Sequence, residues 1–322
     1  MLVVRLALAG DTMLGRLVAE RLATDGPGSL FAPEVVESTR EADLFVLNLE
    51  CCISERGTRW AAPGKPFFFR APPKAAETLR LLGVDCVTLA NNHALDYGGV
   101  ALADTLDTLA GAGISVVGAG TDEAAARRPA VIERDGLRLA VLGFADHPVD
   151  FAAGAGRPGI AFADLAHGVP DWLRRAVADA GDGTDAVVVT PHWGPNMTSG
   201  PVQTVRRAAR VLRDAGATLV AGHSAHVFHG VEDRVLYDLG DFVDDYRVDD
   251  VLRNDLGLLW LIDIDRHGPA RLEAVPLHLD YCHTTIATGV AARWIGDRFR
   301  AACAEFGTAV AEEDGRLVVE WR

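Results

Sequence analysis

The feature of this sequence that most constrains its fold is a repeated alternation of short apolar segments with helical ones. Runs rich in β-branched or aliphatic residues, such as Leu2–Ala9, Val84–Thr88 and Asp185–Thr190, are typical of buried strands. Between them, leucines recur at helical spacing in segments such as Val100–Ala112. Because strands that alternate with helices usually pair in parallel, the chain up to Val117 predicts an α/β fold with a largely parallel sheet.

Antiparallel strands are expected further along the chain. The segments Ala130–Glu133 and Leu137–Phe144 flank a short turn and predict a hairpin. Leu236–Phe242 is predicted to be one strand with a polar end. Two long apolar strands are predicted at Leu256–Ile264 and Ala270–Leu279, followed by a helix and a final hairpin.

The composition limits the classes of protein to which the chain can belong. Its 322 residues include 31 Lys and Arg against 45 Asp and Glu, which gives a formal net charge of −14. This charge disfavours nonspecific binding to nucleic acid or to an anionic membrane. The five cysteines are odd in number and show no CxxC spacing, so neither a disulfide framework nor a zinc ribbon is expected.

The organisation of the chain predicts a single domain over residues 1–322, because no repeat, low-complexity tract or clear linker interrupts it. The N-terminal apolar run has no basic segment before it and is too short to span a bilayer. We therefore expect a cytoplasmic protein that does not associate with membranes, with an unknown oligomeric state.

Polar side chains follow five of the apolar segments. They are Asp11, Asn48 with Glu50, Asn92 with His93 and Asp96, His192, and His223 with His226. Each group alone could cap a helix or form a turn. Because the carboxyl ends of parallel strands share one sheet edge, where ligands bind in α/β folds, the five groups are expected to converge. Oxygen and imidazole donors without a thiolate predict a divalent metal ion, either Ca, Mn, Mg, Fe or Zn.

Six short motifs carry a resemblance to a known family. They are Gly10–Gly15, Asn48–Glu50, Ala90–His93 with Asp96–Gly98, His192–Gly194, Gly222–Val227 and Leu239–Phe242. In this order they resemble CapA-like proteins, the capsule or poly-γ-glutamate synthesis branch of the calcineurin-like metallophosphoesterases, over about residues 5–265. The resemblance implies a calcineurin-like α/β/β/α sandwich, in which two packed mixed sheets are flanked by helices.

The resemblance also implies roles for individual residues. The metal ligands would be Asp11, Glu50, Asn92, His192, His223 and His226. His93, oriented by Asp96, would be the acid/base group. Two positions depart from the dinuclear phosphoesterases, which usually present Asp-x-His at the first strand end and a bridging Asp at the second. Here Met13 and Glu50 stand at those positions, which makes a tight two-metal phosphate clamp less secure.

The remaining candidate site residues are suited to acid/base chemistry. His93 with Asp96 forms one pair, and His226 with Asp11 is predicted to form a second across the cavity. Two such carriers can remove a proton from one face of a carbon and deliver one to the other. CapA-like proteins include epimerases of ribosomal peptides such as lasso peptides, so epimerisation at a peptide Cα is the leading hypothesis. The substrate would be a peptide or another small molecule.

Two alternatives remain open on the sequence. The first is hydrolysis of a phosphoester or an amide by a metal-activated water, and the second is a non-catalytic binding module with the same fold. Asn48, Arg70, Trp193, Asn196 and Asp241 are weaker candidates for substrate contacts. Four other histidines, His147, His229, His278 and His283, are expected to be structural or to lie on the surface.

Overall fold

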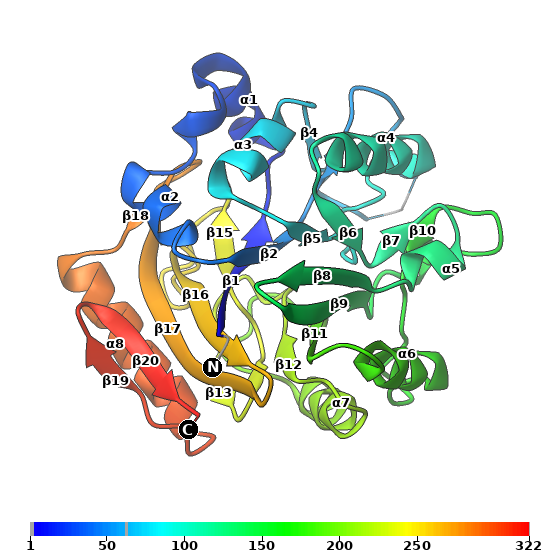
Figure 1. Cartoon of the computed structure of the whole chain (residues 1–322). Coiled ribbons are helices and arrows are strands. Elements are labelled where there is room, and N and C mark those ends of the chain that lie inside the picture. The colour runs from blue at the N-terminus through cyan, green and yellow to red at the C-terminus, as the bar shows by residue number, and fades with distance from the viewer. Residues whose placement is uncertain (1–2, 62–63, 322) are drawn as a thin grey trace.

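Two β-sheets pack face to face and carry helices on their outer sides (Figure 1). The computed structural model describes residues 3–61 and 64–321. Apolar residues fill three layers: one under the helices of the larger sheet, one between the sheets and one under the helices of the smaller sheet. The chain therefore has the α/β/β/α sandwich that the resemblance implied, and that prediction of the fold is confirmed.

The larger sheet is mixed and has ten strands. Its strand order is β19-β20-β17-β16-β1-β2-β5-β6, with β15 beside β1 and β18 beside β17. Strands β1, β2, β5 and β6 are parallel, as the alternation predicted, whereas β16, β17 and β20 are antiparallel. The bounds are β1 Val4–Thr12, β2 Leu44–Leu49, β5 Cys86–Thr88, β6 Ser115–Val117, β15 Asp241–Val243, β16 Leu256–Asp265, β17 Gly268–Leu279, β18 Thr284–Ile286, β19 Ala311–Glu313 and β20 Arg316–Glu320.

The smaller sheet has the order β13-β14-β12-β11-β9-β8. Its strands are β8 Ala130–Arg134, β9 Leu137–Ala145, β11 Ala186–His192, β12 Leu219–Ala221, β13 Val231–Glu232 and β14 Val235–Leu236. Strands β9, β11, β12 and β14 run parallel, so their carboxyl ends also share one edge. Two short pairs complete the strands, namely β3 Cys52–Ile53 with β4 Arg70–Ala71 and β7 Ala119–Gly120 with β10 Gly159–Ile160.

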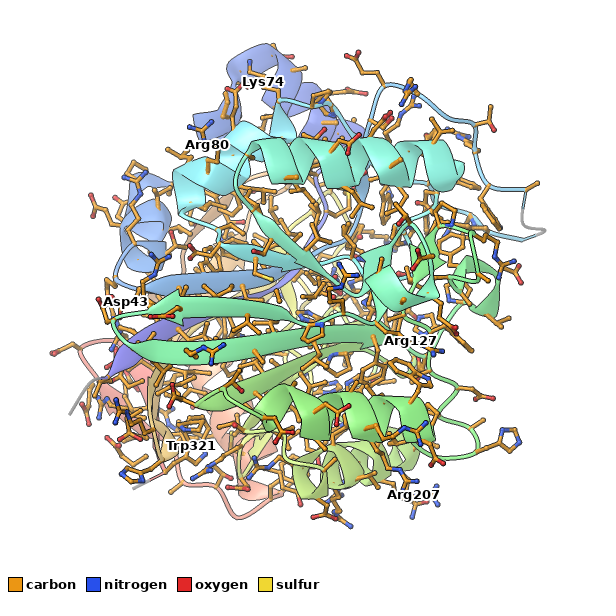
Figure 2. The ribbon with its side chains drawn as sticks, turned by 45° about the vertical axis from the view of Figure 1, so that its right-hand side comes forward. Asp43, Lys74, Arg80, Arg127, Arg207 and Trp321 are labelled. Atoms are coloured by element: carbon orange, nitrogen blue, oxygen red, sulfur yellow. The ribbon has the colours of Figure 1, made fainter. Side chains whose placement is uncertain are left out.

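The helices form the outer layers of the sandwich. On the larger sheet these are α1 Arg16–Asp25, α2 Pro33–Thr39, α3 Ala75–Leu82 and α4 Gly98–Gly111, and on the smaller sheet α6 Asp171–Gly181 and α7 Gln203–Asp214. The others are α5 Glu123–Ala126, α8 Gly289–Ala304 and the short 3-10 turns η1 Pro27–Ser29 and η2 Val149–Phe151. Figure 2 shows Arg80 on α3 and Arg207 on α7 at the two outer surfaces. Among the helices of residues 3–61 and 64–321, none is long and apolar enough to cross a membrane.

The prediction of one strand over Leu236–Phe242 is wrong. The smaller sheet ends at Leu236, and the chain then crosses to the larger sheet, where β15 pairs with β1. Gly240 at the crossing has a φ of 78°, a conformation that residues other than glycine rarely adopt. Its carbonyl accepts a hydrogen bond from the Asp11 backbone at 2.9 Å. The crossing therefore ties both sheets together beside Asp11. The predicted first strand began at Leu2, which lies outside the described residues.

Candidate metal centre and acid/base site

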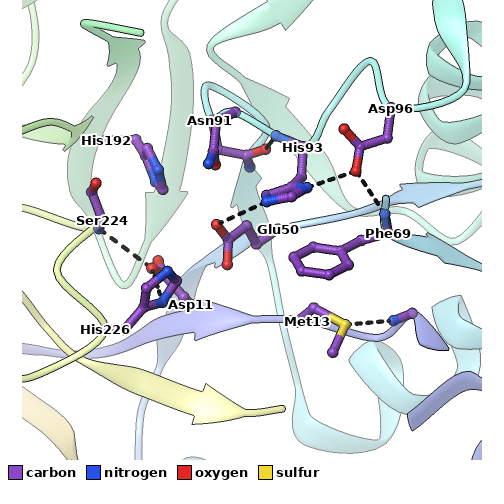
Figure 3. Close-up of polar contacts among 12 residues, drawn as sticks. Asp11, Met13, Glu50, Phe69, Asn91, His93, Asp96, His192, Ser224 and His226 are labelled. Carbon is purple, nitrogen blue, oxygen red and sulfur yellow. Dashed lines mark hydrogen bonds and ion pairs between the residues drawn. The ribbon is translucent and has the colours of Figure 1, made fainter. Parts of the chain in front are cut away.

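The carboxyl ends of parallel strands from both sheets meet at one place (Figure 3). Strand β1 supplies Asp11, and Glu50 directly follows β2, with its backbone N–H donating to the Thr12 carbonyl at 3.0 Å. From the smaller sheet, β11 ends at His192, and His223 lies just beyond β12. A bridge between His192 and His223 aligns these two strand ends. The predicted convergence of the polar strand ends is therefore what the structure shows.

Asp11 lies at the centre of this cluster and is fully buried. Asn48 Nδ2 donates to its Oδ1 at 2.7 Å, and the Nδ1 atoms of His223 and His226 lie 3.2 Å and 3.3 Å from its carboxylate oxygens. Burial alone would raise the pKa of Asp11, but the hydrogen bond with His223 and the charges of the nearby imidazoles outweigh it. The pKa is held well below its ordinary value, so Asp11 is ionised.

Donor atoms of this cluster are spaced as a cation would need them. Ligand atoms of Asp11, Glu50 and His192 lie within 4.8 Å of one another, and so do those of Asp11, His226 and Asp241. Asp11 belongs to both sets and would be shared between them. These oxygen and imidazole donors match the ligand chemistry of divalent cations such as Mg²⁺, Mn²⁺, Fe²⁺ and Zn²⁺.

Several buried oxygen atoms that could coordinate a cation have no hydrogen-bond partner within residues 3–61 and 64–321. Among them are Glu50 Oε1, Asn92 Oδ1 and Asp241 Oδ2. Burial, and then the charge of Asp11, raise the pKa of Glu50 well above its ordinary value. Because buried polar atoms without partners are costly, the cluster fits a bound cation that would use these atoms and stabilise the ionised form of Glu50.

Met13 shows how the site departs from an Asp-x-His strand end. Its side chain is fully buried in the apolar layer under the helices. Its Sδ accepts a hydrogen bond from the Gly15 backbone N–H at 3.1 Å (Figure 3). A thioether is a poor ligand for a hard cation, so Met13 contributes packing at this position.

His93 and Asp96 form a dyad beside the candidate metal ligands (Figure 3). The ring Nδ1 lies 2.6 Å from Asp96 Oδ2, and Nε2 lies 4.0 Å from Glu50 Oε1. The ring stacks on Phe69 with centroids 3.8 Å apart. Burial lowers the pKa of His93 to about 4, although the hydrogen bond with Asp96 opposes this shift. The dyad has the geometry of a held proton carrier.

Asp96 is itself held by the loop that precedes β4. The backbone N–H of Phe69 donates to Asp96 Oδ2 at 2.6 Å, and Lys65 Nζ lies 3.0 Å from Asp96 Oδ1. Lys65 Nζ also donates to the carbonyl of Asn92 at 2.8 Å. The orientation of the dyad therefore depends on a loop far from it in sequence.

His226 lies on a strained turn and faces two carboxylates. Its φ is 59° and that of Ser224 is 110°, both in the left-handed region that only glycine adopts readily. Its Nδ1 lies 2.8 Å from Asp241 Oδ1. Burial disfavours the charged ring, but the charges of Glu50, Asp11 and other carboxylates outweigh it and raise the pKa of His226. Asp238 maintains the turn by accepting from the backbone N–H groups of Ala225 and Gly240.

A cavity of about 760 Å³ opens over the cluster and the dyad. Its walls include His93, His226, Asn92, Phe69, Tyr246 and Arg247. The cavity therefore gives a ligand access to His93 and to two of the candidate metal ligands, Asn92 and His226.

The weaker candidates for substrate contacts fall into three groups. Asn196 lines the cavity. Asn48 and Asp241 are buried in the polar network around Asp11, so they act on other side chains. Arg70 stacks on Tyr97, and Trp193 is buried with its indole N–H donating to the Tyr237 carbonyl. Among the described residues, the cavity walls do not include Arg70 or Trp193, so their contact with a substrate stays a prediction.

The structure also adds residues that the sequence did not single out. Asn91 Nδ2 donates to Asn48 Oδ1 at 2.9 Å, and its own Oδ1 accepts from the His93 backbone. Tyr246 Oη donates to Glu50 Oε2 at 3.2 Å. Asn91 could have been suspected from its place beside Asn92, whereas no local signal connects Lys65 or Tyr246 to the site.

Fold and site together define an α/β/β/α protein of the metallophosphoesterase type, with a candidate metal centre and a His–Asp dyad. Residues 5–246 match the family described as bacterial capsule synthesis protein PGA_cap. The chain belongs to this family and to its CapA-like branch.

Three relatives illustrate this membership. A probable polyglutamine synthesis accessory protein of Mycobacterium tuberculosis is 31% identical, over 98% of this chain and 95% of that protein. The PGA biosynthesis protein CapA of Bacillus subtilis is 29% identical, over 85% of this chain and 71% of that protein. The capsule biosynthesis protein CapA of Bacillus anthracis is 29% identical, over 85% and 67%.

Proposed function

We propose that this chain is a metal-dependent acid/base enzyme that epimerises an amino-acid Cα in a peptide substrate. The observation that carries the proposal is the position of the His93–Asp96 dyad. His93 lines the same cavity as the candidate metal ligands Asn92 and His226, and its Nε2 lies 4.0 Å from Glu50 Oε1. A proton carrier beside a cluster that fits a cation is the arrangement that enolisation of a carbonyl compound requires.

The proposed ligands are Asp11, Glu50, Asn92, His192, His223 and His226, with Asp241 as a further donor. When bound, a divalent cation would supply positive charge that stabilises negative charge developing on a carbonyl oxygen of the substrate. The unpartnered atoms of Glu50, Asn92 and Asp241 support this ligand set.

The protein's own groups would perform the proton transfers. His93 takes a proton from Cα or delivers one to it, and Asp96 fixes the ring through Nδ1. Phe69 excludes water from one face of the ring by stacking on it. The sequence also suggested His226 as the opposing carrier, with Asp11 as its partner. Because ligand atoms of His226, Asp11 and Asp241 all lie within 4.8 Å of one another, we assign His226 to the metal.

The substrate we propose is an anionic peptide of the glutamyl type. The cavity walls carry three basic side chains, Arg16, Lys65 and Arg247, although the chain as a whole has a net charge of −14. Because Arg16 already pairs with Asp245 and Lys65 with Asp96, Arg247 is the cation that would pair with a substrate carboxylate. The name of the Bacillus subtilis relative refers to PGA biosynthesis, which supports this choice. The proposed enzyme acts in the cytoplasm, without nucleic-acid or membrane partners.

Hydrolysis of an amide or phosphoester is the second candidate. It is favoured by the same closeness of His93 to Glu50, because a single imidazole beside a cation can protonate a leaving group while water attacks. Hydrolysis needs only one proton carrier, whereas inversion at Cα needs groups on both faces of the carbon.

One experiment separates these reactions. A γ-glutamyl oligopeptide is incubated with the protein and Mn²⁺ in heavy water and then analysed by mass spectrometry and chiral chromatography. Epimerisation predicts deuterium at Cα and inverted residues without cleavage, and hydrolysis predicts cleavage without deuterium at Cα. If neither occurs with this probe or with an α-linked glutamyl peptide, the chain acts as a binding module and the proposal fails.

The matched variants are His93→Gln and His167→Gln. Loss of the proton carrier is expected to lower the rate about 10²- to 10⁴-fold without changing the metal content. His167 provides the control, because it pairs with Asp164 at 3.3 Å on an exposed loop away from the cavity. A rate for His93→Gln equal to that of the wild type would contradict the assigned role.

A further inference from the structure

We propose that His147 is the second proton carrier of this site and acts on the face of the substrate opposite to His93. The inference rests on the proposed epimerisation. It concerns a histidine that the sequence placed among structural or surface residues, and in the structure His147 lines the cavity.

Asp146 and His147 form a second dyad at the end of β9. The ring Nδ1 of His147 lies 2.5 Å from Asp146 Oδ1. The other carboxylate oxygen accepts from the Gly194 backbone N–H at 3.0 Å, and the Asp146 backbone N–H donates to the His192 carbonyl at 3.1 Å. Asp146 is therefore fixed at both ends, and it fixes the ring of His147 as Asp96 fixes that of His93.

The second ring nitrogen of His147 is available to a substrate. Within residues 3–61 and 64–321, no group forms a hydrogen bond with Nε2 of His147. The side chain is 38% exposed, and it lines the cavity that His93 also lines. His226, by comparison, has its Nδ1 between two buried carboxylates and belongs to the ligand cluster.

The two dyads come from opposite layers of the sandwich. His93 follows β5 in the larger sheet, whereas His147 follows β9 in the smaller sheet (Figure 1). The His147 ring lies beside that of His192, with centroids 5.4 Å apart, while His93 lies beside Glu50. A substrate carbon over the cluster would thus meet one imidazole from each sheet, which is what inversion requires.

The proton balance of the proposed step is simple. One imidazole takes the proton from Cα, and the electron pair of the C–H bond remains as a carbanion delocalised onto the adjacent carbonyl. The other imidazole, protonated beforehand, gives its proton to the opposite face of the same carbon. Exchange of both rings with solvent then restores the starting protonation, so no oxidant or further reactant is needed.

The test uses γ-glutamyl peptides with a single L- or D-residue at the reacting position, in heavy water with Mn²⁺. Wild type exchanges and inverts both isomers. His147→Gln is expected to lower inversion at least about 100-fold. The His147→Gln variant should still exchange the Cα proton of one isomer. The His93→Gln variant should still exchange the Cα proton of the other isomer. A merely structural role would reduce the exchange of both isomers together.

Two controls accompany the variants. His167→Gln alters an exposed Asp–His pair outside the cavity and should leave both isomers at the wild-type rate. Manganese content, measured by elemental analysis, should be unchanged in His147→Gln and reduced in His226→Gln. This second measurement separates a proton carrier from a metal ligand without any turnover.

Four results would overturn the inference. In the first, His147→Gln inverts the peptide at the rate of the wild type. In the second, this variant loses exchange equally for both isomers, and in the third it loses manganese. In the fourth, the wild type itself cleaves the peptide or does not react. In the first three cases wild-type inversion persists and the proposed function stands without His147. In the fourth the proposed epimerisation itself fails, and the role of His147 fails with it.

Discussion

Asn48 and Asn91 hold the central carboxylate of the site through a chain of buried hydrogen bonds. Asn91 Nδ2 donates to Asn48 Oδ1 at 2.9 Å and to the Leu49 carbonyl at 2.8 Å. Asn48 Nδ2 in turn donates to Asp11 Oδ1 at 2.7 Å. All three side chains are fully buried, so each donor and acceptor depends on the next.

Replacement of Asn48 by leucine tests this chain. The change removes the donor to Asp11 and the acceptor of Asn91 while it keeps a similar side-chain volume. Because buried polar groups are left without partners, the free energy of unfolding should fall by about 1–3 kcal/mol. Urea denaturation in the presence of EDTA measures this loss without a contribution from bound cations.

The control is Gln203→Leu on the exposed start of α7. It makes the same polar-to-apolar change without touching a buried network. Equal stabilities of the Asn48 and Gln203 variants would contradict the importance of the chain.

Residues that follow a strand closely in sequence were predictable, and residues that distant loops bring to the site were not. Asp11, Glu50, His192 and His223 converge because parallel strands place their carboxyl ends at one edge. The sequence contains that information as an apolar run followed by a polar residue. By contrast, Asn91 could not be distinguished from its neighbour Asn92, because a turn after a strand does not fix which side chain points inward.

At the scale of elements, two irregular segments complete the site. Residues 237–240 carry the chain from the smaller sheet to the larger one and place Asp241 beside His226. The loop before β4 brings Lys65 and Phe69 to Asp96. Periodicity describes strands and helices but not the path of such loops, which is why Lys65 and the break in the predicted strand Leu236–Phe242 were missed.

Lys65→Met tests whether the loop before β4 is locked onto the dyad. The ammonium group contacts Asp96 Oδ1 at 3.0 Å and the Asn92 carbonyl at 2.8 Å, and its side chain is only 15% exposed. Without it, Asp96 Oδ1 loses its charged partner, and the loop should open more often. Hydrogen exchange of the backbone N–H of Phe69, which bonds to Asp96, should accelerate about 10-fold or more.

Two further variants serve as controls for the hydrogen-exchange measurement on Lys65→Met. Lys65→Arg keeps the positive charge and should restore part of the protection. Lys74→Met, at the start of α3, removes a lysine outside this contact and should leave the exchange of Phe69 unchanged. If Lys65→Met exchanges as slowly as the wild type, the ion pair does not control the loop.

At the scale of the whole molecule, the site concentrates negative charge in an already acidic protein. The net charge is −14, and Asp11, Glu50, Asp238 and Asp241 are all buried within the sandwich. Burial and the neighbouring charges raise the pKa of Glu50, Asp238 and Asp241 well above ordinary values. Burial of these carboxylates close together at the strand ends of both sheets is therefore electrostatically unfavourable. A cation bound between them would reduce this free-energy cost.

Manganese should for this reason stabilise the entire fold and not only the site. A cation that binds the folded state alone adds about 2.7 kcal/mol when present at 100 times its dissociation constant. For a chain of 322 residues that corresponds to an increase in Tm of roughly 4 °C. Calorimetry of the protein stripped with EDTA, before and after Mn²⁺ is added, measures the shift.

Asp11→Asn should abolish the shift in Tm, because Asp11 belongs to both sets of ligand atoms. Glu133→Gln, on the exposed part of β8, should retain the shift. An equal shift in Asp11→Asn and Glu133→Gln would mean that manganese stabilises the acidic surface, and the strand-end cluster would then not be the metal centre.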